Sequence, residues 1–147
     1  MVAISSCITG IKCRYNAKGS YNSSVVEGIR GTYIAVCPEL LAGFGTPRAA
    51  CEIIGGSGED VLNGTARIVD KNGMDITEPM VRGAESALQT CLENGITKAY
   101  LQSKSPTCGC GKIYDGSFSS TLKPGNGIFT ALLKQHGIEV IEVIEVI

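Results

Sequence analysis

The chain has 147 residues, of which 44% are hydrophobic, so it can bury the core of one compact domain spanning residues 1–147. Its 13 Lys and Arg balance 14 Asp and Glu without a basic run, which argues against a nucleic-acid partner. The first residues lack a signal-peptide pattern, and no apolar run reaches the about 20 residues of a membrane span. We therefore expect a cytoplasmic protein without membrane association, whose oligomeric state the composition does not indicate.

Apolar runs and turn residues divide the chain into alternating strand and helix segments. Short runs rich in β-branched residues are typical of buried strands, and apolar residues three or four positions apart are typical of helices. The clearest helix begins at Glu78 and Pro79 and ends at Asn94 and Gly95. In chain order we expect a strand at 2–6, a helix at 23–29, a strand at 32–37, a helix at 78–94, a strand at 97–103, a helix at 127–136 and a strand at 138–143.

This alternation predicts an α/β fold: a single Rossmann-like domain with a mostly parallel sheet flanked by helices on both faces. In such sheets, ligands bind outside the carboxyl ends of the strands. Residues 61–74, with a turn at 70–73, are expected to form a small hairpin or an insertion beside that crevice.

The seven cysteines are the most informative residues for chemistry. A reducing compartment argues against structural disulfides, and the single histidine, His136, offers little for zinc binding or acid–base catalysis. Cys7 and Cys108 follow predicted strands and Cys37 ends one, so their loops should open at the same edge of the sheet. Three converging thiolates can hold an iron–sulfur cluster or a soft metal ion, with one metal position left open to substrate.

The other cysteines are less clearly functional. Cys91 lies on the apolar face of the predicted helix 78–94, where a buried core residue is the natural interpretation. Cys13, Cys51 and Cys110 lie near the predicted ligand loops. A direct role for any of them, as an alternative ligand or a persulfide carrier, stays open.

Several segments occur in the order of a known family. They are Ser6-Cys7 with Gly10 and Arg14-Tyr15-Asn16, Val36-Cys-Pro-Glu39, Thr46-Pro-Arg48 with Glu52, Lys104-Ser-Pro-Thr-Cys-Gly109 and Ile113-Tyr-Asp-Gly116. Together they resemble the DUF523 family, whose characterised members are the thiouracil desulfidases (TudS). The resemblance extends from Ser6 to about Gly127, which is nearly the whole chain.

This resemblance implies an oxygen-sensitive 4Fe-4S cluster held by Cys7, Cys37 and Cys108. The iron without a cysteine would bind the sulfur of a small thiolated nucleobase such as 2-thiouracil. In the family's reaction, oxygen from water replaces that sulfur, and uracil and hydrogen sulfide are released. The residues agree with this chemistry, because a thiophilic iron can accept the departing sulfide.

Two residues beside the predicted ligands are our candidates for catalysis, and both match motif positions of the family. Glu39 follows Cys37 by two residues and is predicted to act as the general acid–base group. Ser105 precedes Cys108 by three residues and is predicted to relay a proton or to hydrogen-bond the base. Four further polar residues are predicted to bind the substrate: Arg48, Tyr15, Asn16 and Asp115.

Structural roles compete with several of these assignments, and for Arg48 the alternative is a salt bridge to Glu52. Glu39 would also stabilise the start of a helix after Pro38, Ser105 would cap its own loop, and Asp115 would stabilise a turn. At the level of function, the main alternative is a non-catalytic iron–sulfur or zinc protein that stores metal or senses redox state. A third possibility is a regulatory domain that binds a small thio-compound without converting it.

Overall fold

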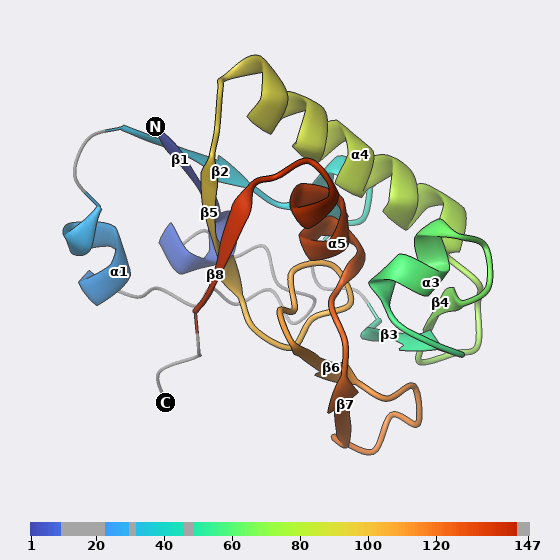
Figure 1. Ribbon diagram of the computed structural model, residues 1–147. Helices are drawn as coiled ribbons and strands as arrows, with labels where there is room; N and C mark the ends of the chain where they lie inside the picture. Colours follow the sequence, from blue (N-terminus) through green and yellow to red (C-terminus); the bar gives the residue numbers. More distant parts are fainter. Residues whose placement is uncertain (10–22, 30–31, 46–48, 144–147) are drawn as a thin grey trace.

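The computed structural model describes residues 1–9, 23–29, 32–45 and 49–143 (Figure 1). Each predicted strand and helix is present, within one residue of its predicted bounds at either end. The strands are β1 (Val2–Ser5), β2 (Tyr33–Val36), β3 (Cys51–Ile54), β4 (Arg67–Asp70), β5 (Lys98–Gln102), β6 (Lys112–Tyr114), β7 (Leu122–Pro124) and β8 (Glu139–Val143). The helices are η1 (Ser6–Thr9, a 3-10 helix), α1 (Ser23–Gly28), α2 (Pro38–Leu41), α3 (Gly58–Leu62), α4 (Thr77–Glu93) and α5 (Ile128–Gln135).

Four strands form a central sheet in the order β2-β1-β5-β8, and every neighbouring pair is parallel. β1 pairs with β2 from Val2 opposite Tyr33 to Ser5 opposite Val36. This arrangement confirms the predicted α/β fold with a mostly parallel sheet. Because the strands run in one direction, all four carboxyl ends lie along the same edge.

Alternate residues of the central strands enter two separate apolar clusters on the two faces of the sheet. On β1, Ala3 belongs to the larger cluster, which contains the buried faces of α4 and α5. The next residue, Ile4, belongs to a smaller cluster with Val25 and Val26 of α1. Figure 1 likewise shows α1 on one side of the sheet and both α4 and α5 on the other. Helices therefore cover both faces, which explains why neighbouring residues of β1 are apolar and buried on both sides of the sheet.

Helix α4 carries one buried stripe against the sheet. Met80, Ala84, Ala87 and Cys91 are at most 1% exposed, and their three- and four-residue spacing places them on one face. Burial raises the pKa of the Cys91 thiol to about 11. This placement confirms that Cys91 is a core residue.

Helix α4 also comes into close contact with α2 at Gly83. A Cβ atom at this position would clash with the carbonyl oxygen of Pro38 and would lie 2.7 Å from the Cβ of Ala42. The glycine therefore lets the two helices approach, and it supports the segment between Cys37 and Glu39.

We expect Gly83→Ala to lower the free energy of unfolding by about 1–3 kcal/mol, because the added methyl group forces the helices apart. At an unconstrained helical site the same change would stabilise the helix by roughly 0.5–1 kcal/mol. Gly28→Ala is the matched control, since Gly28 of α1 has no atom within 4 Å of the new Cβ. Urea unfolding measures both, and a Gly83→Ala protein as stable as wild type would contradict the close packing.

The expected small hairpin or insertion at 61–74 is confirmed only around its turn, where Val69 and Asp75 form an isolated antiparallel bridge. Val61 lies in α3, and β4 pairs antiparallel with the upstream strand β3. A capping box begins α3, in which the Ser57 amide donates to Asp60 Oδ2 at 2.8 Å. The predicted turn at 70–73 is present, since the Gly73 amide donates to the Asp70 carbonyl at 3.0 Å.

A second antiparallel pair, β6 with β7, was not predicted from the sequence. Both strands have only three residues, and Pro124 ends β7, so their sequences carry little strand signal. The hairpin nevertheless helps to position the site, because Lys104 forms an isolated bridge with Ile113 of β6.

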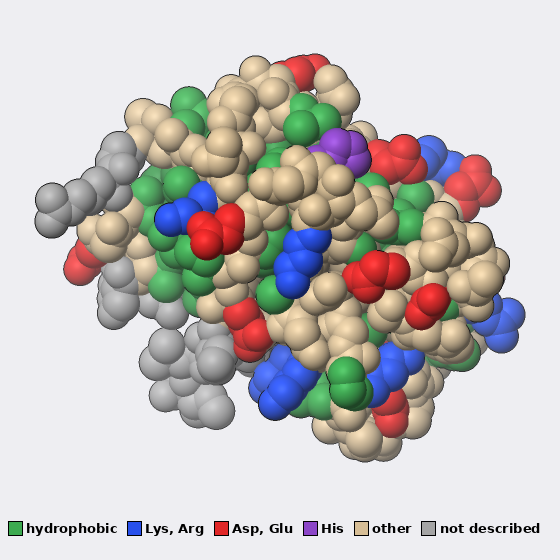
Figure 2. Space-filling model, viewed as in Figure 1, with side chains coloured by type: hydrophobic (Ala, Val, Ile, Leu, Met, Phe, Trp, Pro, Cys, Tyr) green, Lys and Arg blue, Asp and Glu red, His purple; other side chains and the backbone are tan. Residues whose placement is uncertain are grey.

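The surface carries charges of both signs. On the face shown in Figure 2, acidic and basic side chains are interspersed over most elements. Within the described residues, none of the helices has both the length and the apolar composition needed to cross a membrane. The absence of a nucleic-acid partner stays a prediction.

Candidate functional site

The order of the strands creates a crevice at the carboxyl edge of the sheet. The chain leaves β1 toward β2 on one side, whereas it leaves β5 toward β8 on the other. Since β1 and β5 are neighbours, the connections diverge between them, which is where doubly wound sheets bind ligands.

A cavity of about 360 Å³ lies at this point. Residues that follow β1, β2 and β5 contribute to its wall, together with residues from β3, from the turn after β4 and from the β6–β7 hairpin. Five of the predicted functional residues line it: Cys7, Cys37, Glu39, Ser105 and Cys108. Cys51, at the start of β3, lines the same cavity.

The structure gives no such placement for the other predicted site residues. Tyr15, Asn16 and Arg48, as well as Cys13, lie outside the described residues. Asp115 is not among the described residues that line the cavity. Its carboxylate accepts hydrogen bonds from the amide and the hydroxyl of Ser117, and these bonds lower its pKa. Asp115 therefore stabilises a turn, and its neighbour Tyr114 lines the cavity instead.

Cys37 occupies its position because of the proline that follows it. Pro38 begins α2, and a residue before proline is restricted to extended conformations. Cys37 accordingly has φ −138° and ψ 101° and forms the N-cap of the helix. Glu39 then lies in the first turn of α2, where a carboxylate also interacts favourably with the helix dipole.

The loop that carries Cys108 is folded back on itself. The Cys108 amide donates to Ser105 Oγ at 2.8 Å, and the Gly109 amide donates to the Ser105 carbonyl at 2.9 Å. A Cβ atom on Gly109 would lie 2.6 Å from that carbonyl oxygen, so the glycine between Cys108 and Cys110 is required by this turn. Ser105 thus caps its own loop and lines the cavity at once.

The same loop also caps the start of α5. The amides of Ile128 and Phe129 donate to the carbonyls of Pro106 and Thr107 at 2.8 and 2.9 Å. In addition, Thr130 Oγ1 donates to the Cys108 carbonyl at 3.0 Å. Because these bonds satisfy amides that a helix start leaves without partners, they hold the Cys108 backbone rigidly at the cavity.

The Cys108 thiol is strongly influenced by its surroundings. Burial raises its pKa to about 12, a hydrogen bond with Ser5 opposes that shift, and the charges of Cys37 and Glu39 add to it. These influences show that side chains following three different strands act on one sulfur. At neutral pH the thiol holds its proton, so a metal that binds there must displace it.

Several buried polar side chains at the cavity were not predicted as functional, among them Glu52, Gln102 and Ser103. Glu52 is 8% exposed, and its Oε1 accepts hydrogen bonds from the amides of Gly116 and Phe118 at 2.9 and 3.2 Å. Gln102 and Ser103, at the end of β5, are also buried in the lining. The signal for the latter pair was available, since both lie at the carboxyl end of the strand predicted at 97–103.

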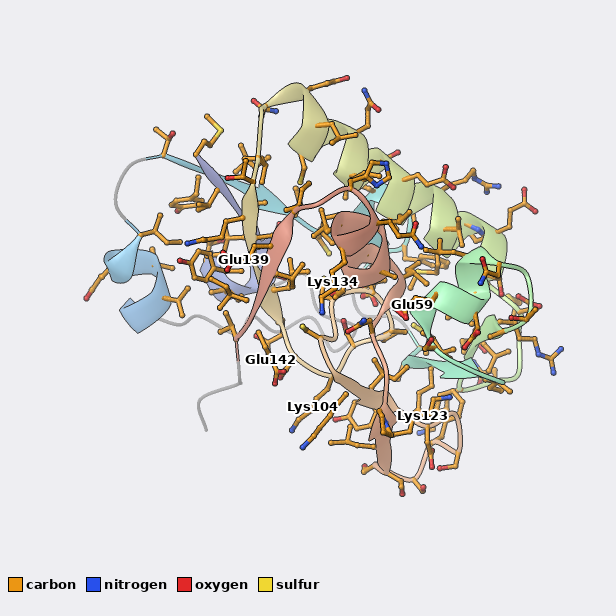
Figure 3. The ribbon with its side chains drawn as sticks, viewed as in Figure 1. Glu59, Lys104, Lys123, Lys134, Glu139 and Glu142 are labelled. Atoms are coloured by element: carbon orange, nitrogen blue, oxygen red, sulfur yellow. The ribbon has the colours of Figure 1, made fainter. Side chains whose placement is uncertain are left out.

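Backbone strain also concentrates around the cavity. The described non-glycine residues with positive φ are Lys104 at 73°, Phe118 at 55° and Ser120 at 60°, and all three line it. Strained backbone of this kind clusters at ligand sites, where the surrounding structure maintains it. Figure 3 shows Lys104 below the carboxyl end of β5, toward the β6–β7 hairpin.

The fold and the site together define a doubly wound α/β protein that gathers cysteine thiols, a carboxylate and a serine hydroxyl at the switch point of its sheet. The chain belongs to the 2-thiouracil desulfurase family, whose family model matches residues 2–145. This confirms the resemblance that the sequence motifs indicated.

Two further comparisons agree with this family. The uncharacterized protein YbbK of Bacillus subtilis (strain 168) is 49% identical over 146 residues, which cover 96% of this chain and 94% of that protein. The solved structure of the 4Fe-4S-dependent thiouracil desulfidase TudS (DUF523Vcz) is 38% identical and superimposes with a TM-score of 0.81. The match covers 96% of this chain and 89% of that one.

Proposed function

We propose that this protein is a desulfidase that removes sulfur from thiolated pyrimidine bases, converting 2-thiouracil to uracil and hydrogen sulfide. The proposal assigns Cys7, Cys37 and Cys108 as ligands of a 4Fe-4S cluster. The observation that carries it is the convergence of these three cysteines on one cavity with Glu39 and Ser105. The 4Fe-4S dependence of the similar TudS supports the same assignment.

The donor set fits such a cluster. The described residues contain no group of three His, Cys, Asp or Glu side chains arranged around a single metal ion. A 4Fe-4S cluster makes a different demand, because each of its cysteines binds a separate iron. Three thiols around a cavity of about 360 Å³ match that demand, and sulfur ligands favour iron over magnesium or calcium.

The protein's own residues would prepare the attack of water on the carbon–sulfur bond. When bound, the cluster would supply a thiophilic iron that takes the sulfur of the substrate. Glu39 is close enough to influence the Cys108 thiol electrostatically, so its carboxylate is placed to accept a proton from water beside the same sulfur.

Ser105 has a second role besides the proposed proton relay. Its Oγ accepts the Cys108 amide and lies 3.2 Å from Thr107 Oγ1, which in turn donates to Cys108 Sγ at 3.7 Å. In this arrangement the Thr107 hydroxyl donates its hydrogen to Cys108 Sγ. We propose that it stabilises the Cys108 thiolate once the proton has been displaced.

The test is to reconstitute the protein with iron and sulfide without oxygen, and then to incubate it with 2-thiouracil. We expect about four irons and four sulfides per chain and the loss of the ultraviolet band of 2-thiouracil as uracil forms. A loaded protein that leaves 2-thiouracil unchanged would favour a binding or sensing protein. A colourless protein that takes up zinc instead would contradict the cluster itself.

Because an oxygen-sensitive cluster and reduced thiols require a reducing compartment, we also propose a cytoplasmic location.

A further inference from the structure

Two buried polar atoms in the wall of the cavity have no hydrogen-bond partner. They are Oε1 of Gln102 and Oγ of Ser103, in residues that are 6% and 7% exposed. Both residues line the cavity. Within the described chain, no other buried side-chain oxygen or nitrogen is left in this state.

These atoms require an explanation, because buried polar groups in folded proteins are almost always hydrogen-bonded. The backbone at this point is well satisfied, since the Gln102 amide donates to Ser5 Oγ at 3.0 Å. The Ser103 amide likewise donates to the Val143 carbonyl at 3.0 Å. The backbone of Gln102 is therefore held in place, while the carboxamide oxygen of its side chain is available to a ligand in the cavity.

The position of Gln102 restricts what this partner can be. It ends β5, and the loop that follows it carries Ser105 and Cys108 into the same cavity. A carboxamide is neutral and holds an acceptor and a donor side by side. It is thus complementary to the edge of a nucleobase, which alternates N–H and C=O groups.

We propose that Gln102 recognises the substrate by accepting a hydrogen bond from a ring N–H adjacent to the thiocarbonyl group. This inference rests on the proposed function, and it names the substrate class as thiopyrimidines that keep this N–H. In 2-thiouracil both ring nitrogens flank the thiocarbonyl carbon, so the sulfur can point toward the cysteines while one N–H faces the strand end. A ring methylated at that nitrogen lacks the donor.

The test measures binding of uracil, which has the same N–H groups but is not converted. In the cluster-loaded protein, Gln102→Met keeps the length of the side chain and removes its acceptor. We expect the Kd for uracil to rise on the order of tenfold in calorimetric titrations. Of N1-methyluracil and N3-methyluracil, the base that lacks the recognised N–H should bind wild type as weakly as uracil binds the variant. Gln89→Met is the control, because Gln89 is an exposed residue of α4, and it should leave every Kd unchanged.

Thermal unfolding separates recognition from a structural role. Removing a buried atom that has no partner should leave the Tm of Gln102→Met at or above that of wild type. If that variant fails to fold, Gln102→Asn keeps the amide but shortens its reach, and it should weaken uracil binding similarly. A lower Tm together with an equal loss of affinity for uracil and both methylated bases would overturn the proposal.

The outcome also separates this inference from the proposed function. If wild type converts 2-thiouracil and Gln102→Met binds uracil normally, the inference fails and the desulfidase stands. If wild type binds uracil through Gln102 but never converts 2-thiouracil, the desulfidase fails and the recognition site stands.

Discussion

Glu39→Gln should lower the turnover of 2-thiouracil by about 10²- to 10⁴-fold, the usual contribution of a general acid–base group. The amide has the same shape as the carboxylate but cannot accept a proton from water. Glu39 is well placed for this role, because it lines the cavity and its charge raises the pKa of the Cys108 thiol. Single-turnover kinetics on anaerobically loaded protein would measure the effect.

The expected loss should leave the cluster intact. Iron and sulfide contents of Glu39→Gln should equal those of wild type, since the proposed ligands are unchanged. Glu85→Gln makes the same substitution at an exposed position of α4 and should keep full turnover. If iron and sulfide fall in parallel with activity, Glu39 is a structural residue at the start of α2.

Cys108→Ser should remove the cluster and with it all conversion of 2-thiouracil. A hydroxyl is a poor ligand for the iron of such clusters, which are held by thiolates. The fold should survive, because the bonds that fix this loop use the Cys108 amide and carbonyl, whose partners are Ser105 and Thr130. Iron and sulfide analysis after anaerobic reconstitution, with circular dichroism of the same sample, provides the measurement.

Cys110→Ser is the matched control for this prediction. Cys110 lies two residues away and is half-buried, but it is not among the described residues that line the cavity. We expect the variant to take up iron and sulfide like wild type. A cluster retained by Cys108→Ser and lost by Cys110→Ser would reverse the ligand assignment in this loop.

Local signals were sufficient for most of the fold. The apolar runs of β1 and β5 and the apolar stripe of α4 are properties of neighbouring residues, so they can be read without knowing what they contact. The main strand pairing of residues 61–74 was missed for the opposite reason. The partner of β4 is β3, which precedes α3 in the sequence. Pairing between strands that are separated in this way depends on how the chain folds back.

The candidate site divides in the same way. Cys7, Cys37 and Cys108 follow three strands that were predicted to be parallel, and parallel strands bring their carboxyl ends to one edge. Their shared cavity was therefore implied by strand order. The buried bonds of Glu52 were not, because they join it to residues that follow β6, 64 and 66 positions further along the chain. The turn role of Asp115 was already one of the alternatives in the sequence, since its partner Ser117 lies two residues away.

The sequence by itself thus determined the elements, the α/β class, the family motifs and the three cysteines at strand ends. Only the tertiary structure decided which polar side chains are buried and which of their hydrogen bonds are satisfied. Gln102 is the clearest case, since nothing in the sequence distinguishes it from any other glutamine, yet its side-chain oxygen is buried without a hydrogen-bond partner. Its unsatisfied oxygen follows from the packing of residues distant in sequence around it, and such packing leaves no local pattern in the chain.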